Sequence, residues 1–245
     1  MQAVFEKRYH LRIGDFDASR HLRPSTVLDL FQCVAAEHAE ELGIGLDRML
    51  EQELIWVLVR VRYEIERPIT YGTERLHVKT WPLAPRRSGF QREYRVTDAA
   101  GNLLIRGTSD WVLMHRVRRR LMPVGDIYPK DIEYLTEQSF EGRVSPIPDT
   151  RTEEPPVPFM LRYSDLDMNG HVNNTRYLDW CCNALGIDVL RSSELAAFAI
   201  NYNQEILPEQ EVRTELRRLG SDFSFSGFHG EARSFDVGGV LRPIE

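Results

Sequence analysis

The chain has 245 residues, of which 42% are hydrophobic, 28% charged and 10% aromatic, and this composition excludes a disordered or fibrous protein. The net charge of −6 gives no support to nucleic-acid binding, which favours a basic domain, and no apolar run is long enough to cross a bilayer. The length fits two domains of about 100–120 residues each.

The first half of the chain predicts a strand, a helix and then further strands. A strand-like pattern opens at Phe5. Pro24 and Ser25 suit the start of a helix, apolar residues then recur at helical spacing, and Gly43 is placed to end it. From Ile55 to Ile65 the apolar residues alternate with others, which is typical of a long strand. Shorter alternations follow over residues 76–81, 90–97 and 103–115.

The second half predicts the same order of elements after an irregular stretch. Residues 128–157 contain several prolines and little periodicity, which predicts a linker or surface crossover between a domain over 1–127 and a domain over 158–245. Asn173 or Asn174 can cap a helix that Gly186 ends. Strands are expected over residues 198–206, 212–219, 221–228 and 232–240.

One motif occurs twice, 150 residues apart. Residues 15–29 read DFDASRHLRPSTVLD, and residues 165–179 read DLDMNGHVNNTRYLD, with five identities and no gap. Both copies precede the same series of elements, as in a duplicated structural unit. The chain therefore predicts an α+β fold of two tandem hotdog domains, each a curved antiparallel sheet around a central helix. Another α+β topology stays open, because periodicity does not fix topology.

The second copy carries a family resemblance. The segment from Ser164 to Tyr177 resembles the active-site segment of acyl-acyl carrier protein (acyl-ACP) thioesterases, which release fatty acids from acyl carrier protein. Residues 54–60 and the Trp-containing residues 109–123 resemble two further stretches of this family. The similarity extends from residue 8 to residue 220. It implies a hydrolase of acyl-ACP and, because no plastid transit peptide precedes Phe5, a bacterial, cytoplasmic form.

The resemblance also implies the site residues. Asp167, Asn169 and His171 match catalytic positions of the family motif, and Glu205 matches a family Glu that lies in a strand. The family places a Cys after this Glu, whereas this chain has Ile206, so a nucleophilic Cys at that position is excluded. No metal or other cofactor is implied.

These residue types suit thioester hydrolysis. The leaving thiol has a pKa of about 8.5, so the enzyme must mainly supply an oriented nucleophile and a site for the oxyanion. Asp167 is expected to activate water or attack directly, Asn169 to orient the water or the carbonyl, and His171 to transfer protons while Glu205 holds its tautomer. The sequence leaves open which carboxylate is the base.

The first copy is expected to be a degenerate site, and the family resemblance implies that it holds the acyl chain. It has Ser19 where the second copy has Asn169. The first half also has many apolar and aromatic side chains, from which four substrate-binding residues are predicted: Trp56, Val57, Val59 and Trp111.

Two further groups of residues have alternative interpretations. Arg116, Arg118, Arg119 and Arg120 form either a solvated face or a docking patch for the acidic carrier protein. Cys181 and Cys182 lie at core-like helical spacing and are expected to be buried small residues, not nucleophiles. Three cysteines cannot form a disulfide framework, which favours the reducing cytoplasm.

Other functions are also compatible with parts of the pattern. An acyl-CoA thioesterase shares the chemistry and differs in the carrier. A non-catalytic acyl-binding protein is the alternative from another class, but it would have lost the polar set that the second copy keeps. A metal hydrolase is disfavoured, because His10 and His21 show no ligand spacing. The expected partner is acyl carrier protein, without nucleic acid or membrane, and a homodimer is left open.

Overall fold

The computed structural model describes residues 2–87, 89–125, 127–141 and 157–244. The N-terminal unit contains β1 (Phe5–His10), η1 (Ile13–Asp15), α1 (Pro24–Glu41), α2 (Leu46–Glu51), β2 (Leu54–Ile65), β3 (Arg75–Pro82), β4 (Gly89–Thr97), β5 (Leu103–His115) and β6 (Arg120–Leu121). The C-terminal unit contains β7 (Val157–Phe159), η2 (Tyr163–Asp165), α3 (Arg176–Leu185), α4 (Ile187–Ser192), β8 (Ser193–Tyr202), β9 (Val212–Leu219), β10 (Asp222–His229) and β11 (Ala232–Pro243).

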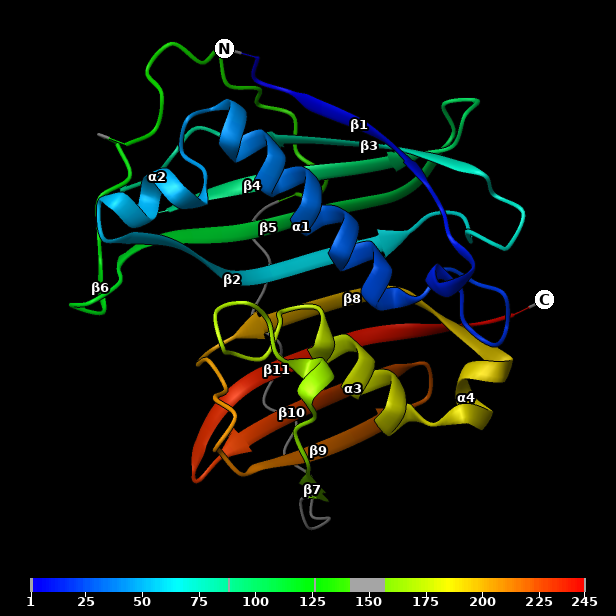
Figure 1. Ribbon diagram of the computed structural model, residues 1–245. Coiled ribbons are helices and arrows are strands. Elements are labelled where there is room, and N and C mark those ends of the chain that lie inside the picture. The colour runs from blue at the N-terminus through cyan, green and yellow to red at the C-terminus, as the bar shows by residue number, and fades with distance from the viewer. Residues whose placement is uncertain (1, 88, 126, 142–156, 245) are drawn as a thin grey trace.

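The strands of both units form one antiparallel sheet. Its order is β1-β3-β4-β5-β2-β8-β11-β10-β9-β7, and β6 pairs with β5. The two units meet at the centre, where β2 pairs with β8 from Arg60↔Asn201 to Glu64↔Ala197. Both α1 and α3 lie on the same face of this sheet, each in front of the strands of its own unit (Figure 1). This is the predicted α+β arrangement of two tandem units, fused edge to edge.

The core fills the space between the helices and the sheet. On α1 the side chains of Val27 and Val34 are fully buried, and Phe31 stacks on Tyr94 of β4 with ring centroids 4.1 Å apart. Gly107 of β5 makes room for this ring, because a Cβ there would lie 2.2 Å from Phe31. The apolar stripe of α1 therefore fixes its position across β4 and β5.

The helix ends agree with the sequence. Helix α1 begins at Pro24, and Gly43 (φ 68°) and Gly186 (φ 88°) follow α1 and α3 in conformations that favour glycine. The sequence did not predict the short helices α2 and α4. The capping prediction was wrong for α3: the helix begins at Arg176, and Asn173 instead accepts hydrogen bonds from the backbone and hydroxyl of Thr175 in the preceding turn.

Strand β8 ends earlier than predicted, and Glu205 lies in the loop after it, not in a strand. The N–H groups of Asn203 and Gln204 both donate to the carbonyl oxygen of Ser234, at 2.9 and 3.0 Å, which ends the regular pairing with β11. The chain then turns towards the second copy of the motif, where the carbonyl oxygen of Ile206 accepts from the N–H of Val172 at 3.0 Å.

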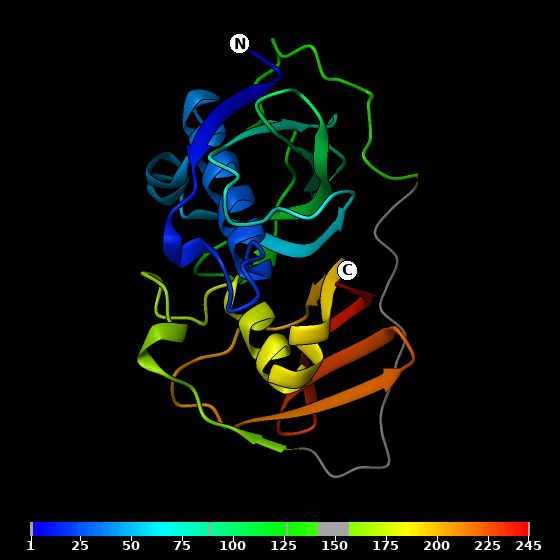
Figure 2. The same ribbon diagram turned by 90° about the vertical axis from the view of Figure 1, so that its right-hand side faces the viewer.

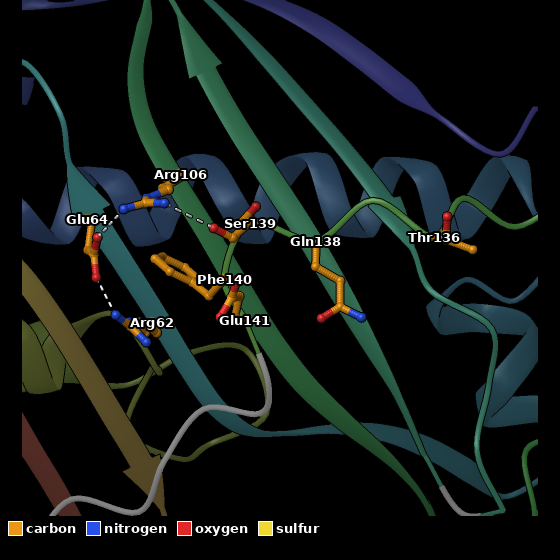
Figure 3. Close-up of a pocket in the computed structure, with 8 residues that line it drawn as sticks. All are labelled: Arg62, Glu64, Arg106, Thr136, Gln138, Ser139, Phe140 and Glu141. Atoms are coloured by element: carbon orange, nitrogen blue, oxygen red, sulfur yellow. Dashed lines mark hydrogen bonds and ion pairs between the residues drawn. The ribbon is translucent and has the colours of Figure 1, made fainter.

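Part of the expected linker packs onto the N-terminal unit. Residues 137–140 run along the face of the sheet away from α1 (Figures 2 and 3). There Trp81 Nε1 donates to the carbonyl oxygen of Glu137 at 3.0 Å, and the N–H of Ser139 donates to buried Glu93 at 2.7 Å. Residues 128–141 of the expected linker therefore pack onto the N-terminal unit, whereas residues 142–156 lie outside the described residues. Among the described helices, none has the length and apolar character that a membrane span requires.

Candidate active site

The loop that carries the predicted site is closed by the buried side chain of Asp165. Its Oδ2 accepts the N–H of Arg162 at 2.7 Å, and its Oδ1 accepts Nε1 of Trp180 at 3.1 Å. Its carbonyl oxygen accepts the N–H of Asn173 at 2.8 Å. The loop thus begins and ends on the same residue and is held against α3.

Within the loop, Asp167 holds Asn169. The Oδ1 of Asp167 accepts the N–H of Asn169 at 2.8 Å, and its Oδ2 accepts the side-chain Nδ2 of Asn169 at 3.3 Å. The N–H of Asp167 donates to the carbonyl oxygen of His171 at 2.9 Å, and Gly170 completes the turn at φ 78°. Both oxygens of Asp167 are therefore engaged in fixing the turn and the amide of Asn169.

His171 of the motif loop lies next to Glu205 of the loop after β8. The Nε2 of His171 lies 3.4 Å from Oε2 of Glu205, and each side chain is 35% exposed. The bond between Val172 and Ile206 ties the two segments together one residue further on. A solvent-accessible His beside a carboxylate is a suitable arrangement for proton transfer.

The other oxygen of Glu205 is held by the N-terminal unit. Its Oε1 accepts a hydrogen bond from Nη2 of Arg119 at 2.5 Å. Arg119 lies in the turn between β5 and β6, so the site contains residues of both units. The sequence assigned Arg119 to the basic patch with Arg116, Arg118 and Arg120, and this contact to Glu205 was missed.

Buried Tyr177 and partly buried Tyr202 lie close to the loop. Burial raises the pKa of Tyr177, and the negative charges of Asp167 and Glu205 raise it further. The hydroxyl of Tyr202 donates to the carbonyl oxygen of Asn174 at 2.7 Å. The sequence places Tyr177 at the end of the motif and on the apolar side of the helix, and it predicts no role for this residue in the site.

The first copy of the motif repeats the turn but has no counterpart of the contact between His171 and Glu205. Asp17 Oδ1 accepts the N–H of Ser19 at 2.8 Å, as Asp167 does from Asn169. The hydroxyl of Ser19, however, donates to the carbonyl oxygen of Leu190 at 3.3 Å.

Among the described residues, no carboxylate pairs with the His of the first copy. Leu22 donates to the carbonyl oxygen of Ile69 at 2.8 Å, as Val172 does to that of Ile206. Pro68, which precedes Ile69, therefore occupies the position of Glu205. The buried Nδ1 of His21 has no hydrogen-bond partner among the described residues.

The structure brings together two of the four residues predicted to bind substrate. Trp56 and Trp111 are partly buried in an apolar cluster beside α1 and α2, where Trp56 meets Phe90 edge-on at 5.2 Å. Val57 follows Trp56 along the strand, so its side chain is on the opposite face of the sheet. Val59 occupies the irregularity where β2 has one more residue than β5.

Both motif-adjacent cysteines have the environment of core residues. Burial raises the pKa of the Cys181 thiol, and mainly burial raises that of Cys182 to about 12. A thiol must ionise to act as a nucleophile. These positions therefore disfavour a role in the chemistry.

The pocket in Figure 3, of about 510 Å³, lies on the face of the sheet away from α1. Phe140 lies between Arg62 and Arg106, with the guanidinium carbons 4.1 and 5.0 Å from its ring centroid. Both arginines also pair with Glu64. These contacts anchor Phe140, so the pocket is a structural feature separate from the candidate site. In the described ranges, no three His, Cys, Asp or Glu side chains are grouped to hold a metal ion.

Family models cover most of the chain. The model described as acyl-ACP thioesterase N-terminal domain matches residues 2–132, and the one described as acyl-ACP thioesterase C-terminal domain matches residues 149–232. The chloroplastic palmitoyl-acyl carrier protein thioesterase of Gossypium hirsutum is 28% identical over 217 residues. The match covers 82% of this chain and 52% of that protein, so the chain spans about half the length of this curated relative.

Solved structures confirm the tandem hotdog fold. The 12:0-ACP thioesterase from Umbellularia californica superposes with a TM-score of 0.82 at 23% identity, over 99% of this chain and 98% of that one. An acyl-ACP thioesterase from Bacteroides thetaiotaomicron gives 0.83 at 20% identity, over 98% of both chains.

Proposed function

Because the chain belongs to the acyl-ACP thioesterase family, we propose that it hydrolyses fatty acyl-ACP to free fatty acid and holo-ACP. The observation that carries this proposal is the contact of His171 with Glu205, 3.4 Å apart, beside the loop that presents Asn169. The first copy keeps the loop and lacks this pair, so the C-terminal unit is proposed to be the hydrolytic one.

The proposed reaction uses water, the side chains of this loop and Glu205 from the loop after β8. His171 takes a proton from water while the water oxygen bonds to the acyl carbon. The C–S bond then breaks, and His171 returns the proton to the leaving sulfur. Glu205 holds the imidazole in place, and the amide of Asn169 orients the water or the acyl carbonyl. The thiolate of a thiol with a pKa of about 8.5 is a good leaving group, so no stronger acid is needed.

Asp167 is proposed to act through Asn169. Both of its oxygens accept hydrogen bonds from Asn169, at 2.8 and 3.3 Å, and the same turn occurs at Asp17 in the first copy. This engagement favours a supporting role over general-base or nucleophilic attack by Asp167. The carboxylate beside His171 is Glu205.

The acyl chain is proposed to bind in the N-terminal unit. Trp56 and Trp111 offer partly buried aromatic surface on the helix side of the sheet. Each methylene group buried there contributes about 0.8 kcal/mol, so a small change in depth alters the preferred length.

The carrier protein is proposed to dock on the basic turn between β5 and β6. The side chains of Arg116, Arg118 and Arg120 are exposed there, next to the Arg119 that contacts Glu205. A local positive patch on a chain of net charge −6 attracts an acidic partner. The proposed setting is the cytoplasm, and the three free cysteines agree with a reducing compartment.

The test is turnover of acyl-ACP and acyl-CoA over matched chain lengths, with a folded His171→Ala variant as the blank. The expected result is release of fatty acid and thiol in equal amounts, with higher kcat/KM for acyl-ACP. Equal kcat/KM for both carriers would favour an acyl-CoA thioesterase. Saturable acyl binding without turnover would favour a non-catalytic acyl-binding protein.

A further inference from the structure

The carboxylate of Glu205 is held at both oxygens by residues from different units. Oε2 faces Nε2 of His171 at 3.4 Å, and Oε1 accepts from Nη2 of Arg119 at 2.5 Å. A planar guanidinium fixes the direction of a carboxylate that it binds. With Oε1 bound to Arg119, Oε2 is the oxygen that remains for the imidazole.

The turn that carries Arg119 is itself anchored. The N–H of Arg119 donates to the carbonyl oxygen of His115 at 2.9 Å, and the N–H of Arg118 donates to Nδ1 of the same His at 3.3 Å. His115 is buried, and its Nε2 lies 3.5 Å from Glu53, whose carbonyl oxygen accepts from the N–H of Arg116 at 2.8 Å. The turn is therefore fixed to the start of β2.

Arg119 also has an unusual backbone. Its φ of 50° is in the left-handed region, which a long side chain rarely adopts. A disfavoured backbone persists where surrounding contacts determine it. Here those contacts are the bond to His115 at one end and the ion pair with Glu205 at the other.

The other arginines of the turn differ from Arg119. Arg116, Arg118 and Arg120 are exposed, and within the described part of the chain their guanidinium groups make no ion pair. Arg119 is exposed as well, with half of its side chain accessible, so what sets it apart is its ion pair with Glu205. Docking and positioning are therefore separable functions of neighbouring residues.

We infer that Arg119 is a positioning residue, supplied by the N-terminal unit, which orients Glu205 towards His171 of the C-terminal unit. This inference rests on the hydrolytic function proposed above. It implies that the hydrolytic pair is complete only when the basic turn is seated against the loop after β8. A carrier protein bound on the outer arginines would then lie directly beside the reacting groups.

The kinetic test compares Arg119→Met, Arg119→Lys and Arg118→Met on acyl-ACP and acyl-CoA. We expect Arg119→Met to lower kcat on both substrates by roughly tenfold to a hundredfold, with KM for acyl-CoA unchanged. Arg119→Lys should recover part of kcat, since it keeps the charge and one hydrogen bond. Arg118→Met should instead raise KM for acyl-ACP alone. An Arg119→Met effect confined to KM for acyl-ACP would assign Arg119 to docking and overturn the inference.

A double-mutant cycle with Glu205→Gln tests whether Arg119 acts through Glu205. The two substitutions should be strongly non-additive, so that Arg119→Met costs little once the carboxylate is gone. Additive losses would contradict the inference.

A third measurement does not depend on turnover. The imidazole NMR signals of His171 in the full-length protein should change in Arg119→Met and stay unchanged in Arg118→Met. Unchanged His171 signals in a folded Arg119→Met protein would overturn the positioning role. A parent enzyme that hydrolyses neither substrate would contradict the proposed function instead, and the NMR comparison would still decide the contact.

Discussion

The two copies of the motif have nearly the same backbone and different surroundings. In each, an Asp caps a short turn, with Arg12 N–H donating to Asp15 and Arg162 N–H to Asp165, both at 2.7 Å. In each, the second Asp accepts the N–H two residues later at 2.8 Å. The shared Asp and His residues therefore build a loop, and they do not by themselves make a site.

What separates the copies is a residue contributed by a distant segment. In the C-terminal unit Glu205 lies 3.4 Å from His171, whereas in the N-terminal unit its counterpart is Pro68, one residue before the Ile69 that accepts from Leu22. Proline has neither a carboxylate nor a backbone N–H to offer. We therefore expect hydrolysis to depend on Glu205 and Asn169. The geometry of each loop should depend on its two Asp residues.

The largest expected effect comes from replacing His171, for which His21 is the matched control. His171→Ala should lower kcat by about two to four orders of magnitude, the range of a lost acid–base group. His21→Ala should leave kcat within a few-fold, because no carboxylate in the described part of the chain pairs with that ring. Steady-state rates on acyl-ACP check both, with thermal melting to confirm folding. A folded but inactive His21→Ala protein would break the distinction between the copies.

Asp167 offers a sharper separation of loop geometry from chemistry. Asp167→Ala removes both acceptors of Asn169 and should lower kcat by about a hundredfold or more. Asp167→Asn keeps an acceptor for the Asn169 N–H and should stay within about tenfold of the parent. Asp17→Ala is the matched control, expected to affect melting temperature only. If Asp167→Asn is as inactive as Asp167→Ala, then Asp167 itself is the base or nucleophile.

The sequence predicts the loops well because their determinants are local. Pro24, Gly43 and Gly186 mark helix ends through their own backbone preferences, and the structure confirms these positions. The constant offset of 150 residues between the copies likewise identifies the duplicated loop.

The rest of the site depends on contacts that are distant in sequence. The offset from Pro68 to Glu205 is 137 residues, because α1 and its flanking segments are longer than their counterparts, so a gapless comparison misses this pair. Arg119 meets Glu205 across 86 residues and two units, which are joined where β2 pairs with β8. Its position in a basic run suggested a surface role.

The two units also differ in their interiors, which gives a pH-dependent prediction. His38 of α1 is fully buried, with Nδ1 3.0 Å from Arg92 and Nε2 3.2 Å from the carbonyl oxygen of Gln2. Burial, and then the charge of Arg92, lowers the pKa of His38 to about 4. Helix α3 has no His.

Protons therefore bind more strongly to His38 in the unfolded chain. Its contribution is fully present above the unfolded pKa of about 6.5, and it is lost as the pH falls towards 4, up to about 3 kcal/mol. Urea unfolding at pH 7.5 and pH 5, for the parent and His38→Gln, measures this difference. The variant should lose less stability on acidification. Parallel losses in the two proteins would assign the pH dependence to other groups.

A smaller effect is expected from the proposed acyl pocket in the N-terminal unit. Trp111→Phe removes ring surface from the apolar cluster beside α1 and should shift the preferred chain length, with several-fold changes per two-carbon step. The kcat on the best substrate should stay within about tenfold. Rates over a chain-length series check this. Leu216→Ala in β9 of the C-terminal unit is the control. If only that control moves the length profile, the acyl chain binds in the C-terminal unit.

The smallest effect is expected at the cysteines of α3, which test whether the C-terminal unit contains a second nucleophile. Burial raises the pKa of Cys181, and that of Cys182 rises to about 12, so neither thiol ionises appreciably near neutral pH. Cys182→Ser is nearly isosteric and should leave kcat within a few-fold. Cys181→Ala removes one sulfur from a fully buried position and should lower stability by about 1 kcal/mol through the space it leaves. Its kcat should also change little. Rates and melting temperatures separate these effects. A folded cysteine variant without activity would contradict water attack assisted by His171 and Glu205.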